Sequence, residues 1–242
     1  MGVRRSRRIK GERYLLISNE YSYHDQLSSY TRTDTTDSPT PEAAWDYGYL
    51  PDGDRLFKQD TFTPAEAEFY LHDSGDVIAD YTLDDDTYTL IAAYINGNGI
   101  DGKVAKVDAG TDDAHYYVQE ALGSVHQLLD GDGDVEQVYL NDAWGNAVYS
   151  GGSTENRYQY TGRERDTESD LMYYRARMYD TRTGRFTQKD PSGMLDGMNR
   201  YIYCSNNPVN GTPSPWFPLP TDFFPLARIT ISYPGKSRRR VW

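Results

Sequence analysis

The chain has one cysteine, Cys204, among its 242 residues, so an internal disulfide is excluded. It also lacks any apolar run of the about 20 residues that a membrane-spanning helix needs. Near the start, basic residues are followed only by the apolar run Tyr14–Ile17, which is too short for the core of a signal peptide. Long stretches with helical periodicity are missing as well. These absences exclude a disulfide scaffold, a helical membrane protein and a helical bundle.

Basic charge is scarce in the middle of the chain. The net charge is -12, and all 37 acidic residues lie between Glu12 and Asp222, whereas ten of the 25 basic residues lie in the first ten and last fifteen positions. The middle therefore holds 15 basic residues against 37 acids, and such a body repels nucleic acid. The basic ends are expected to be solvated tails.

Tyrosine (22 residues) and glycine (21 residues) are abundant instead. Tyrosine favours sheets and Asp-Gly pairs favour turns, so the composition predicts many short strands. A unit made of a Tyr-x-Tyr strand, an Asp/Gly turn and a return strand recurs along the chain. The units are residues 20–34, 45–60, 68–85, 117–139, 138–149 and the stretch from 157 onward. Because one hairpin cannot bury its own apolar face, we expect an all-β fold of stacked antiparallel hairpins.

Three of these units carry turn residues at the expected hairpin tips. The tips are Asp52-Gly53, Ser74-Gly75 and Gly145-Asn146. Glycine and asparagine adopt the left-handed backbone conformation that two-residue hairpin loops require.

The stretch 157–210 has the clearest local pattern. Residues 171–179 alternate with a period of two, which predicts one strand with a face suited to burial. Asp180-Thr-Arg-Thr-Gly184 follows as a turn in which Gly184 takes the left-handed conformation, so residues 171–188 are predicted to form a hairpin.

Two further turns are predicted downstream of this hairpin. Asp190-Pro191-Ser192-Gly193 has proline and glycine at the positions that suit a type I turn. Residues 200–204 are predicted to be a strand that Asn206-Asn207-Pro208 ends.

The order of the turn signals T-R-T-G, D-P-S-G and N-N-P resembles the core segment that closes Rhs (rearrangement hotspot, or YD-repeat) proteins. Asn141–Asn146 (N-D-A-W-G-N) resembles the recurring Y-D-x-x-G-N pattern of that family. Gln119–Val125 (Q-E-A-L-G-S-V) is similar to the family phrase Q-D-A-L-G-S-V. The resemblance covers about residues 14–211 and is strong from residue 115 onward.

The resemblance implies a spiralling, hollow β-shell of hairpins whose core plugs one end and cleaves the chain just past itself, freeing a C-terminal toxin. It divides this chain into four parts. They are a basic N-terminal segment (1–13), degenerate YD-type hairpin repeats (14–115), an Rhs repeat-associated core (116–212) and a Pro-rich basic tail (213–242) that is expected to be disordered.

The function that the resemblance implies is structural. The chain is interpreted as a shell and plug fragment of an Rhs-type polymorphic toxin or contact-dependent delivery protein, not catalytic as it stands. Two alternatives stay open: a cell-surface YD-repeat module that binds carbohydrate or another cell, and a self-cleaving aspartic-type autoprotease.

The expected partners are the remainder of a larger shell, a C-terminal toxin cargo, and glycans or another cell surface. Nucleic acid is not an expected partner, and no membrane span is expected. The expected location is extracellular or associated with the cell envelope, as part of a larger exported protein, since this chain has no signal peptide.

Candidate catalytic residues come from the same resemblance, because self-cleavage of the aspartic type needs two carboxylates that share a proton. Asp190 and Asp196 are the candidates, with Arg185 or Arg177 to orient them or to stabilise the oxyanion. The alternative is that Asp190 caps a turn and Asp196 faces water. The second D-P-x-G-L of the family, where cleavage occurs, is replaced here by Gly211-Thr-Pro-Ser-Pro215, so activity in this chain is not expected.

Aromatic side chains on a flat sheet suit the apolar faces of sugar rings. The candidates for such a ligand site are Trp45, Tyr47, Tyr49 and Trp144. The alternative, which we favour, is that these rings pack between hairpins.

No metal or cofactor is expected. Asp130-Gly-Asp-Gly-Asp134 has the spacing of the first ligands of a calcium loop, but Val135 replaces the needed glycine and Asn141 the bidentate glutamate. A hairpin tip is predicted there instead. The four histidines have no ligand spacing, and a single cysteine rules out a zinc pattern.

Overall fold

The computed structural model describes residues 2–10, 13–22, 24–34, 40–63, 67–84, 87–98, 101–191, 193 and 198–211. Thirteen strands form one antiparallel sheet, here called the curved sheet, in the order of the sequence. They are β1 (Gly2–Lys10), β2 (Arg13–Tyr21), β3 (Leu27–Asp34), β4 (Thr40–Tyr49), β5 (Arg55–Asp60), β6 (Glu68–Asp73), β7 (Asp76–Asp84), β8 (Thr87–Asn96), β9 (Lys103–Asp108), β10 (Ala114–Gln119), β11 (Val125–Leu129), β12 (Val135–Asn141) and β13 (Ala147–Gly152).

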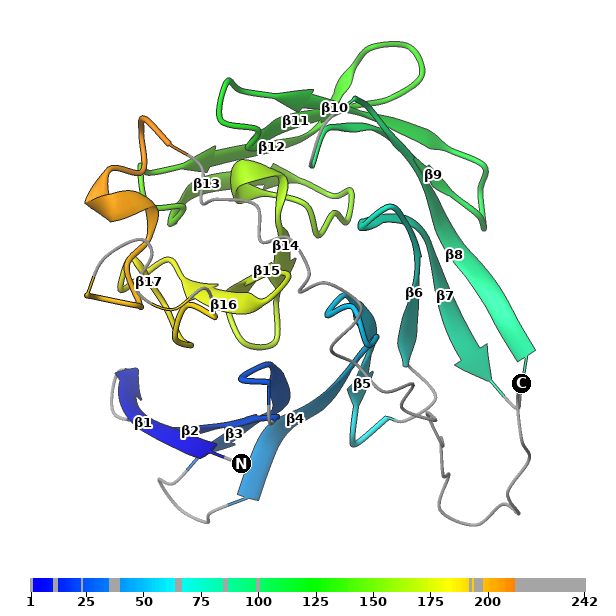
Figure 1. Cartoon of the computed structure of the whole chain (residues 1–242). Helices are drawn as coiled ribbons and strands as arrows, with labels where there is room; N and C mark the ends of the chain where they lie inside the picture. Colours follow the sequence, from blue (N-terminus) through cyan, green and yellow to red (C-terminus); the bar gives the residue numbers. More distant parts are fainter. Residues whose placement is uncertain are drawn as a thin grey trace.

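The curved sheet is a meander in which each strand pairs with its neighbours in the sequence (Figure 1). β-Bulges shift the register in many of the pairs, for example between Asp80 and Tyr81 in β7 and between Val118 and Gln119 in β10. A bulge bends its strand and increases the local twist. The sheet accordingly curls into an arc whose concave face is turned toward the C-terminal part of the chain (Figure 1).

The predicted hairpin tips are confirmed at Gly53, Gly75 and Gly145, whose φ angles are 100°, 85° and 84°. Side chains other than glycine rarely adopt this left-handed region. At Gly145 packing adds a second requirement, because a Cβ atom there would lie 2.5 Å from the ring of Tyr160.

Three tips share a hydrogen-bond pattern that starts from an acidic residue. The carboxylate of Asp142 accepts hydrogen bonds from the amides two and four residues further on, at 2.8 and 2.9 Å. Asp130 and Glu120 accept from the amides at the same two positions in their own turns. Amides that the strand ladder leaves free at each tip are satisfied in this way.

A second, four-stranded sheet, here called the inner sheet, lies inside the arc (Figure 1). Its strands are β14 (Glu164–Asp166), β15 (Leu171–Tyr174), β16 (Arg177–Asp180) and β17 (Arg185–Phe186), and the short 3-10 turn η2 (Tyr160–Gly162) precedes them. The predicted turn between β16 and β17 is confirmed, since Gly184 has a φ of 64° and its amide donates to the carbonyl of Asp180 at 2.9 Å.

The prediction of one strand over residues 171–179 is wrong. The chain reverses at Arg175, whose φ is 58°, and β15 and β16 pair with each other as antiparallel neighbours. All four residues of β15 are buried, because one face packs against the curved sheet and the other against a tyrosine cluster. The alternating pattern therefore did not separate a buried face from a solvated one.

The strand predicted over residues 200–204 is wrong as well. Ile202 makes a single isolated bridge to Arg185, and the chain then enters the 3-10 turn η3 (Cys204–Asn206). Positive φ angles at all three residues of η3 are incompatible with an extended strand. The predicted turn at Asp190 is confirmed by a hydrogen bond of 3.2 Å from the amide of Gly193 to the carbonyl of Asp190.

At the N-terminal end β1 pairs along its whole length with β2, from Gly2 opposite Tyr21 to Lys10 opposite Arg13, so the backbone of this segment is a strand and not a free tail. Among the described strands β1 and β13 each have one partner, so this part of the curved sheet has two open edges. The Pro-rich tail predicted over residues 213–242 lies outside the described residues. The four-part division of the chain stays a prediction.

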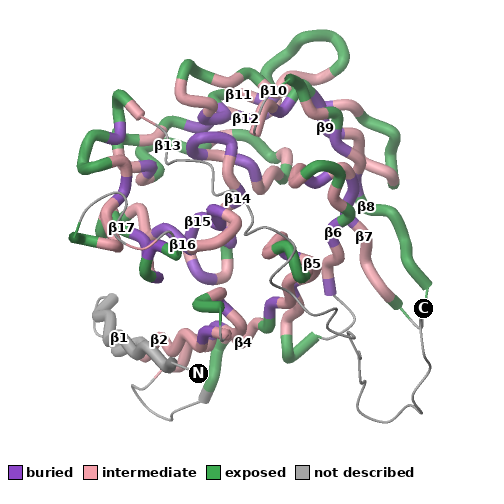
Figure 2. Tube along the Cα trace, viewed as in Figure 1, coloured by how far each residue is buried: buried purple, intermediate pink, exposed green. Residues whose placement is uncertain are grey.

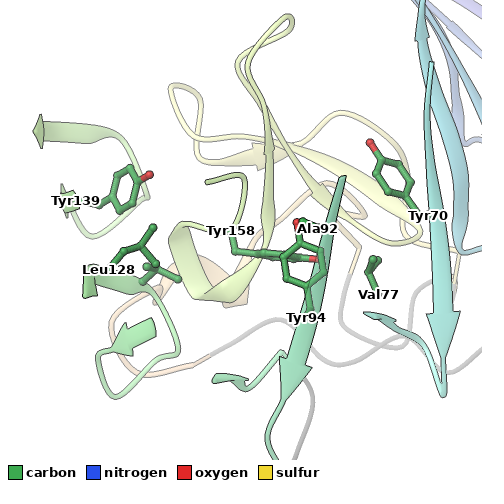
Figure 3. Close-up of a cluster of buried hydrophobic side chains, with 8 residues drawn as sticks. Tyr70, Val77, Ala92, Tyr94, Leu128, Tyr139 and Tyr158 are labelled. Atoms are coloured by element: carbon green, nitrogen blue, oxygen red, sulfur yellow. The ribbon is translucent and has the colours of Figure 1, made fainter. Parts of the chain in front are cut away.

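The buried residues lie mainly where the two sheets face each other (Figure 2). One apolar cluster joins strands of the curved sheet to Tyr158 in the linker before the inner sheet (Figure 3). A second joins β2–β4 to Leu171, Tyr173 and Met178. The third, the tyrosine cluster, consists of Tyr160, Met172, Tyr174, Tyr179, Phe186 and Tyr203.

Candidate functional site

The concave face of the curved sheet meets the inner sheet through buried charges. Arg55 of β5 is 1% exposed, and its Nη1 lies 2.8 and 2.7 Å from the two carboxylate oxygens of Asp166 in β14. Its Nη2 lies 2.6 Å from Glu164 Oε2. Charge-assisted, bidentate pairs of this kind are short and geometrically specific. Arg55 therefore fixes the position of β14 on the curved sheet.

A second arginine extends this network. Arg157, in the linker before η2, lies 2.9 Å from Asp80 of β7 and 3.8 Å from Glu164. The other carboxylate oxygen of Asp80 accepts a hydrogen bond of 2.6 Å from the hydroxyl of Tyr94. Arg55, Asp80, Arg157, Glu164 and Asp166 together are called the charged interface below.

Tyrosine rings fill the space between these charges. The ring of Tyr70 lies between the two guanidinium groups, 4.4 Å from that of Arg157 and 5.3 Å from that of Arg55. Arg55 also lies 4.4 Å from the ring of Tyr173. Figure 3 shows Tyr70 together with Tyr94 and Tyr158 in this region. Desolvated cation–π contacts add to the attraction of the carboxylates.

The electrostatic balance keeps Glu164 and Arg55 charged. Burial raises the pKa of Glu164, but the guanidinium groups of Arg157 and Arg55 outweigh it and lower that pKa to about 2. Burial lowers the pKa of Arg55, but Asp166 and Glu164 raise it above its ordinary value. At Asp80 burial outweighs the attraction of Arg157, so the pKa of that carboxyl is raised.

Further ion pairs join the two sheets around a small polar cavity. Arg163 lies 2.8 Å from Asp101, and Arg175, at the tip between β15 and β16, lies 3.3 Å from Asp76 and 3.4 Å from Asp101. The cavity, of about 20 Å³, is also lined by His72. It has room for about one water molecule.

Sequence reasoning missed the whole charged interface. A partial signal was present, since Arg157 stands directly before Tyr158 and Glu164 lies in the most distinctive stretch of the chain. The partners of Arg55 are 109 and 111 residues away, and nothing local marks them.

The predicted catalytic residues are only partly brought together. Asp190 is 9% exposed, and its carboxylate lies 2.8 Å from Nη1 of Arg177, the alternative arginine of the prediction. Arg185 lies in β17 with an exposed side chain. Asp196 lies outside the described residues. Near this pair, Gln188 is 1% exposed and its Nε2 has no hydrogen-bond acceptor, so it can donate to a carbonyl oxygen.

The four predicted ligand-binding aromatics contact other parts of the protein. Tyr47 is 5% exposed, and its hydroxyl donates to Glu168 at 2.9 Å. The hydroxyl of Tyr49 donates to the carbonyl of Leu27. Trp45 and Tyr49 pack against the second apolar cluster, and Trp144 packs against the tyrosine cluster. Stacking on sugar rings stays a prediction, and the observed packing does not favour it.

Among the described residues, no group of histidine, cysteine and acidic side chains is arranged to hold a metal ion. In the same part of the chain, no helix is long and apolar enough to cross a membrane. The Asp130 carboxylate, considered above for calcium, instead accepts the two turn amides.

The fold defines a class of protein: an antiparallel meander that curls around its own C-terminal sheet. No family model matches the chain. An alignment of 102 positions, which covers 39% of the chain, is 39% identical to "tRNA3(Ser)-specific nuclease WapA" of Bacillus spizizenii. An alignment of 107 positions, which covers 42% of the chain, is 32% identical to "Toxin subunit YenC1" of Yersinia entomophaga.

A solved structure shares the fold. The crystal structure of TcdB2-TccC3-Cdc42 matches 81% of this chain with a TM-score of 0.66 and 21% sequence identity. The matched regions span 4% of the nuclease, 11% of the toxin subunit and 10% of the TcdB2-TccC3-Cdc42 chain. The relatives of this chain are thus much longer proteins, and they include a nuclease and a toxin subunit.

Proposed function

We propose that this chain is a segment of the β-shell, together with its closing plug, of an Rhs-type polymorphic toxin or contact-dependent delivery protein. The observation that carries the proposal is the burial of Arg55 from the curved sheet between two carboxylates of the inner sheet. A sheet that encloses a cargo needs a closed end, and a plug held by specific buried charges keeps one orientation.

In this proposal the curved sheet (β1–β13) is the wall and the inner sheet (β14–β17) is the part of the Rhs core that closes it. The open edges of β1 and β13 have backbone groups free to pair with further strands. The partners are accordingly the remaining hairpins of a larger shell and a C-terminal toxin cargo. The site of action is outside the producing cell, as part of an exported protein.

The first experiment tests whether the inner sheet is held as a plug. A site-specific protease sequence is inserted between Ser153 and Thr154, after β13, and the purified protein is cut there. We expect the two pieces to co-elute in size-exclusion chromatography, because the charged interface does not depend on that peptide link.

Arg55→Met in the same cut protein should release the C-terminal piece, whereas the exposed Arg185→Met serves as the matched control and should not. Immediate separation of the two pieces in the unsubstituted protein would overturn the plug assignment.

The coding sequence on either side of this chain gives an independent test of the wider proposal. Further Tyr-x-Tyr, Asp/Gly hairpin units in frame upstream, and a D-P-x-G-L phrase followed by a toxin domain downstream, are the expected findings. Unrelated genes on both sides would contradict it.

A second proposal, a single-turnover autoprotease, is favoured by one observation: the buried Asp190 carboxylate lies 2.8 Å from Arg177. Such a pair supplies one of the two carboxylates that aspartic-type cleavage needs, with a cation beside it. Intact-mass spectrometry on the protein incubated for days tests it. Cleavage that Asp190→Asn abolishes supports the proposal, and an intact chain excludes it.

A further inference from the structure

Glu168 is a buried acid between the two sheets that the charged interface does not satisfy. It follows β14, and its side chain is 4% exposed. Oε1 accepts a hydrogen bond of 2.9 Å from the hydroxyl of Tyr47 in β4. Within the described part of the chain Oε2 has no hydrogen-bond partner, and the Lys58 Nζ atom lies 3.9 Å from it. Half of this carboxyl group is therefore buried without a donor.

The charged and titratable groups that face Glu168 come from five strands. They are Tyr30 of β3, Tyr47 of β4, Arg55 and Lys58 of β5, Glu68 of β6 and Asp166 of β14. Arg55 is already engaged by Asp166 and Glu164, and Lys58 also lies 3.7 Å from Glu68. The cations nearby are thus shared with other acids, whereas the negative charge of Asp166 is close.

A buried carboxyl group beside another carboxylate favours its neutral form. Burial and, after it, the charge of Asp166 raise the pKa of Glu168 from 4.5 to about 7, although Lys58 and Arg55 act in the opposite direction. Glu164, four residues earlier, has two guanidinium groups in contact and remains ionised.

We propose that Glu168 is a proton-operated latch: when it takes up a proton near neutral pH, the inner sheet packs more tightly on β4 and β5. The latch rests on the proposed role of the inner sheet as the closing part of the shell. It adds a control, namely that acidification below neutral pH strengthens the closure.

The direction follows from proton linkage. In the unfolded chain Glu168 ionises around 4.5, whereas in the folded protein it ionises around 7. Between these two pH values the folded state binds one proton more than the unfolded state. The free energy of unfolding therefore falls as the pH rises through this window and is constant above it. Each pH unit inside the window changes the unfolding equilibrium constant by up to about tenfold.

The test is urea unfolding of the whole chain at several pH values from 5 to 8, for the unsubstituted protein and for Glu168→Gln. Glutamine mimics the protonated carboxyl, so the variant should be at least about tenfold more stable toward unfolding at pH 8, with a gap that closes toward pH 5. Glu155→Gln, at an exposed position, is the matched control and should follow the unsubstituted protein. A gap that does not change with pH, or a variant less stable throughout, overturns the latch.

Tyr47→Phe gives a second measurement in case glutamine packs poorly. Removing the phenol takes away a hydrogen bond that favours the ionised carboxylate, so the pH window should move upward. An unchanged window overturns the proposal. If the same fraction of the cut pieces co-elutes at every pH, the latch is overturned but the plug assignment is not.

Discussion

The two faces of β15 are held in different ways. Leu171 and Tyr173 face the curved sheet, where the guanidinium group of Arg55 in the charged interface lies 4.4 Å from the ring of Tyr173. Met172 and Tyr174 face the tyrosine cluster, in which the rings of Tyr179 and Tyr203 stack at 4.2 Å. Aromatic rings supply a large buried area with broad tolerance of geometry, whereas paired charges tolerate little displacement. Charge pairs thus fix the position of the inner sheet on one face, and aromatic rings fill the space against its other face.

Removing one partner of the charged interface should have the largest effect. Arg55→Met leaves Asp166 buried without its cation and Glu164 with Arg157 alone, and should lower the free energy of unfolding by about 3–5 kcal/mol. Urea unfolding followed by tyrosine and tryptophan fluorescence measures this. Arg185→Met, at an exposed position, is expected to stay within about 0.5 kcal/mol of the unsubstituted protein. Equal effects of the two substitutions would mean that Arg55 does not position the sheet.

Acid should weaken the same side of β15. The depressed pKa of Glu164 contributes stability that is present above about 4.5 and is lost as the pH falls toward 2, by about 3 kcal/mol in all. The difference in unfolding free energy between the unsubstituted protein and Glu164→Gln, measured from pH 2 to 6, isolates this group. The difference should shrink on acidification, and a constant difference would show that Glu164 is not held ionised.

On the aromatic side a truncation should be tolerated better. Tyr179→Leu removes a ring that is fully buried and the hydrogen bond of 2.9 Å from its hydroxyl to the carbonyl of Trp144. We expect a loss of about 2–3 kcal/mol, since leucine refills part of the cavity. Thermal unfolding compares it with Arg55→Met. A larger loss than that of Arg55→Met would reverse the comparison between the two faces.

The smallest expected effect lies outside both faces, at a hairpin tip. Asp142→Ala removes the acceptor of two turn amides and should cost about 1 kcal/mol. Asp132→Ala, in the exposed loop of another tip, is the control and should be close to neutral. Chemical denaturation midpoints measure both. Identical midpoints for the two variants would show that the Asp142 carboxylate does not stabilise its turn.

The hairpins were predictable because their signals are local. Gly53, Gly75 and Gly145 each sit at a turn within a few residues of the strands they join, and their left-handed conformation requires glycine. The same reasoning failed for residues 171–179, because both faces of β15 are buried and alternation then no longer marks the boundary of a strand. The class of fold followed from the hairpins alone.

The candidate site was less predictable for a different physical reason. Asp190 was selected from its place in a resemblance, and Arg177 was one of two possible partners, since the sequence does not say which arginine turns toward it. The pairing of Arg55 with Asp166 depends on how thirteen strands curl, which no short stretch of sequence determines. Charge pairs between distant elements therefore have to be seen in the structure.

The order of strands has a consequence for biosynthesis. Each strand of the curved sheet pairs with the one made just before it, so the hairpins can form one after another as the chain leaves the ribosome. Arg55, by contrast, must wait for more than a hundred further residues before its carboxylate partners are translated. During that interval the guanidinium group of Arg55 is solvated, and the inner sheet does not yet cover the concave face. Closure is thus the last event that translation of this segment permits.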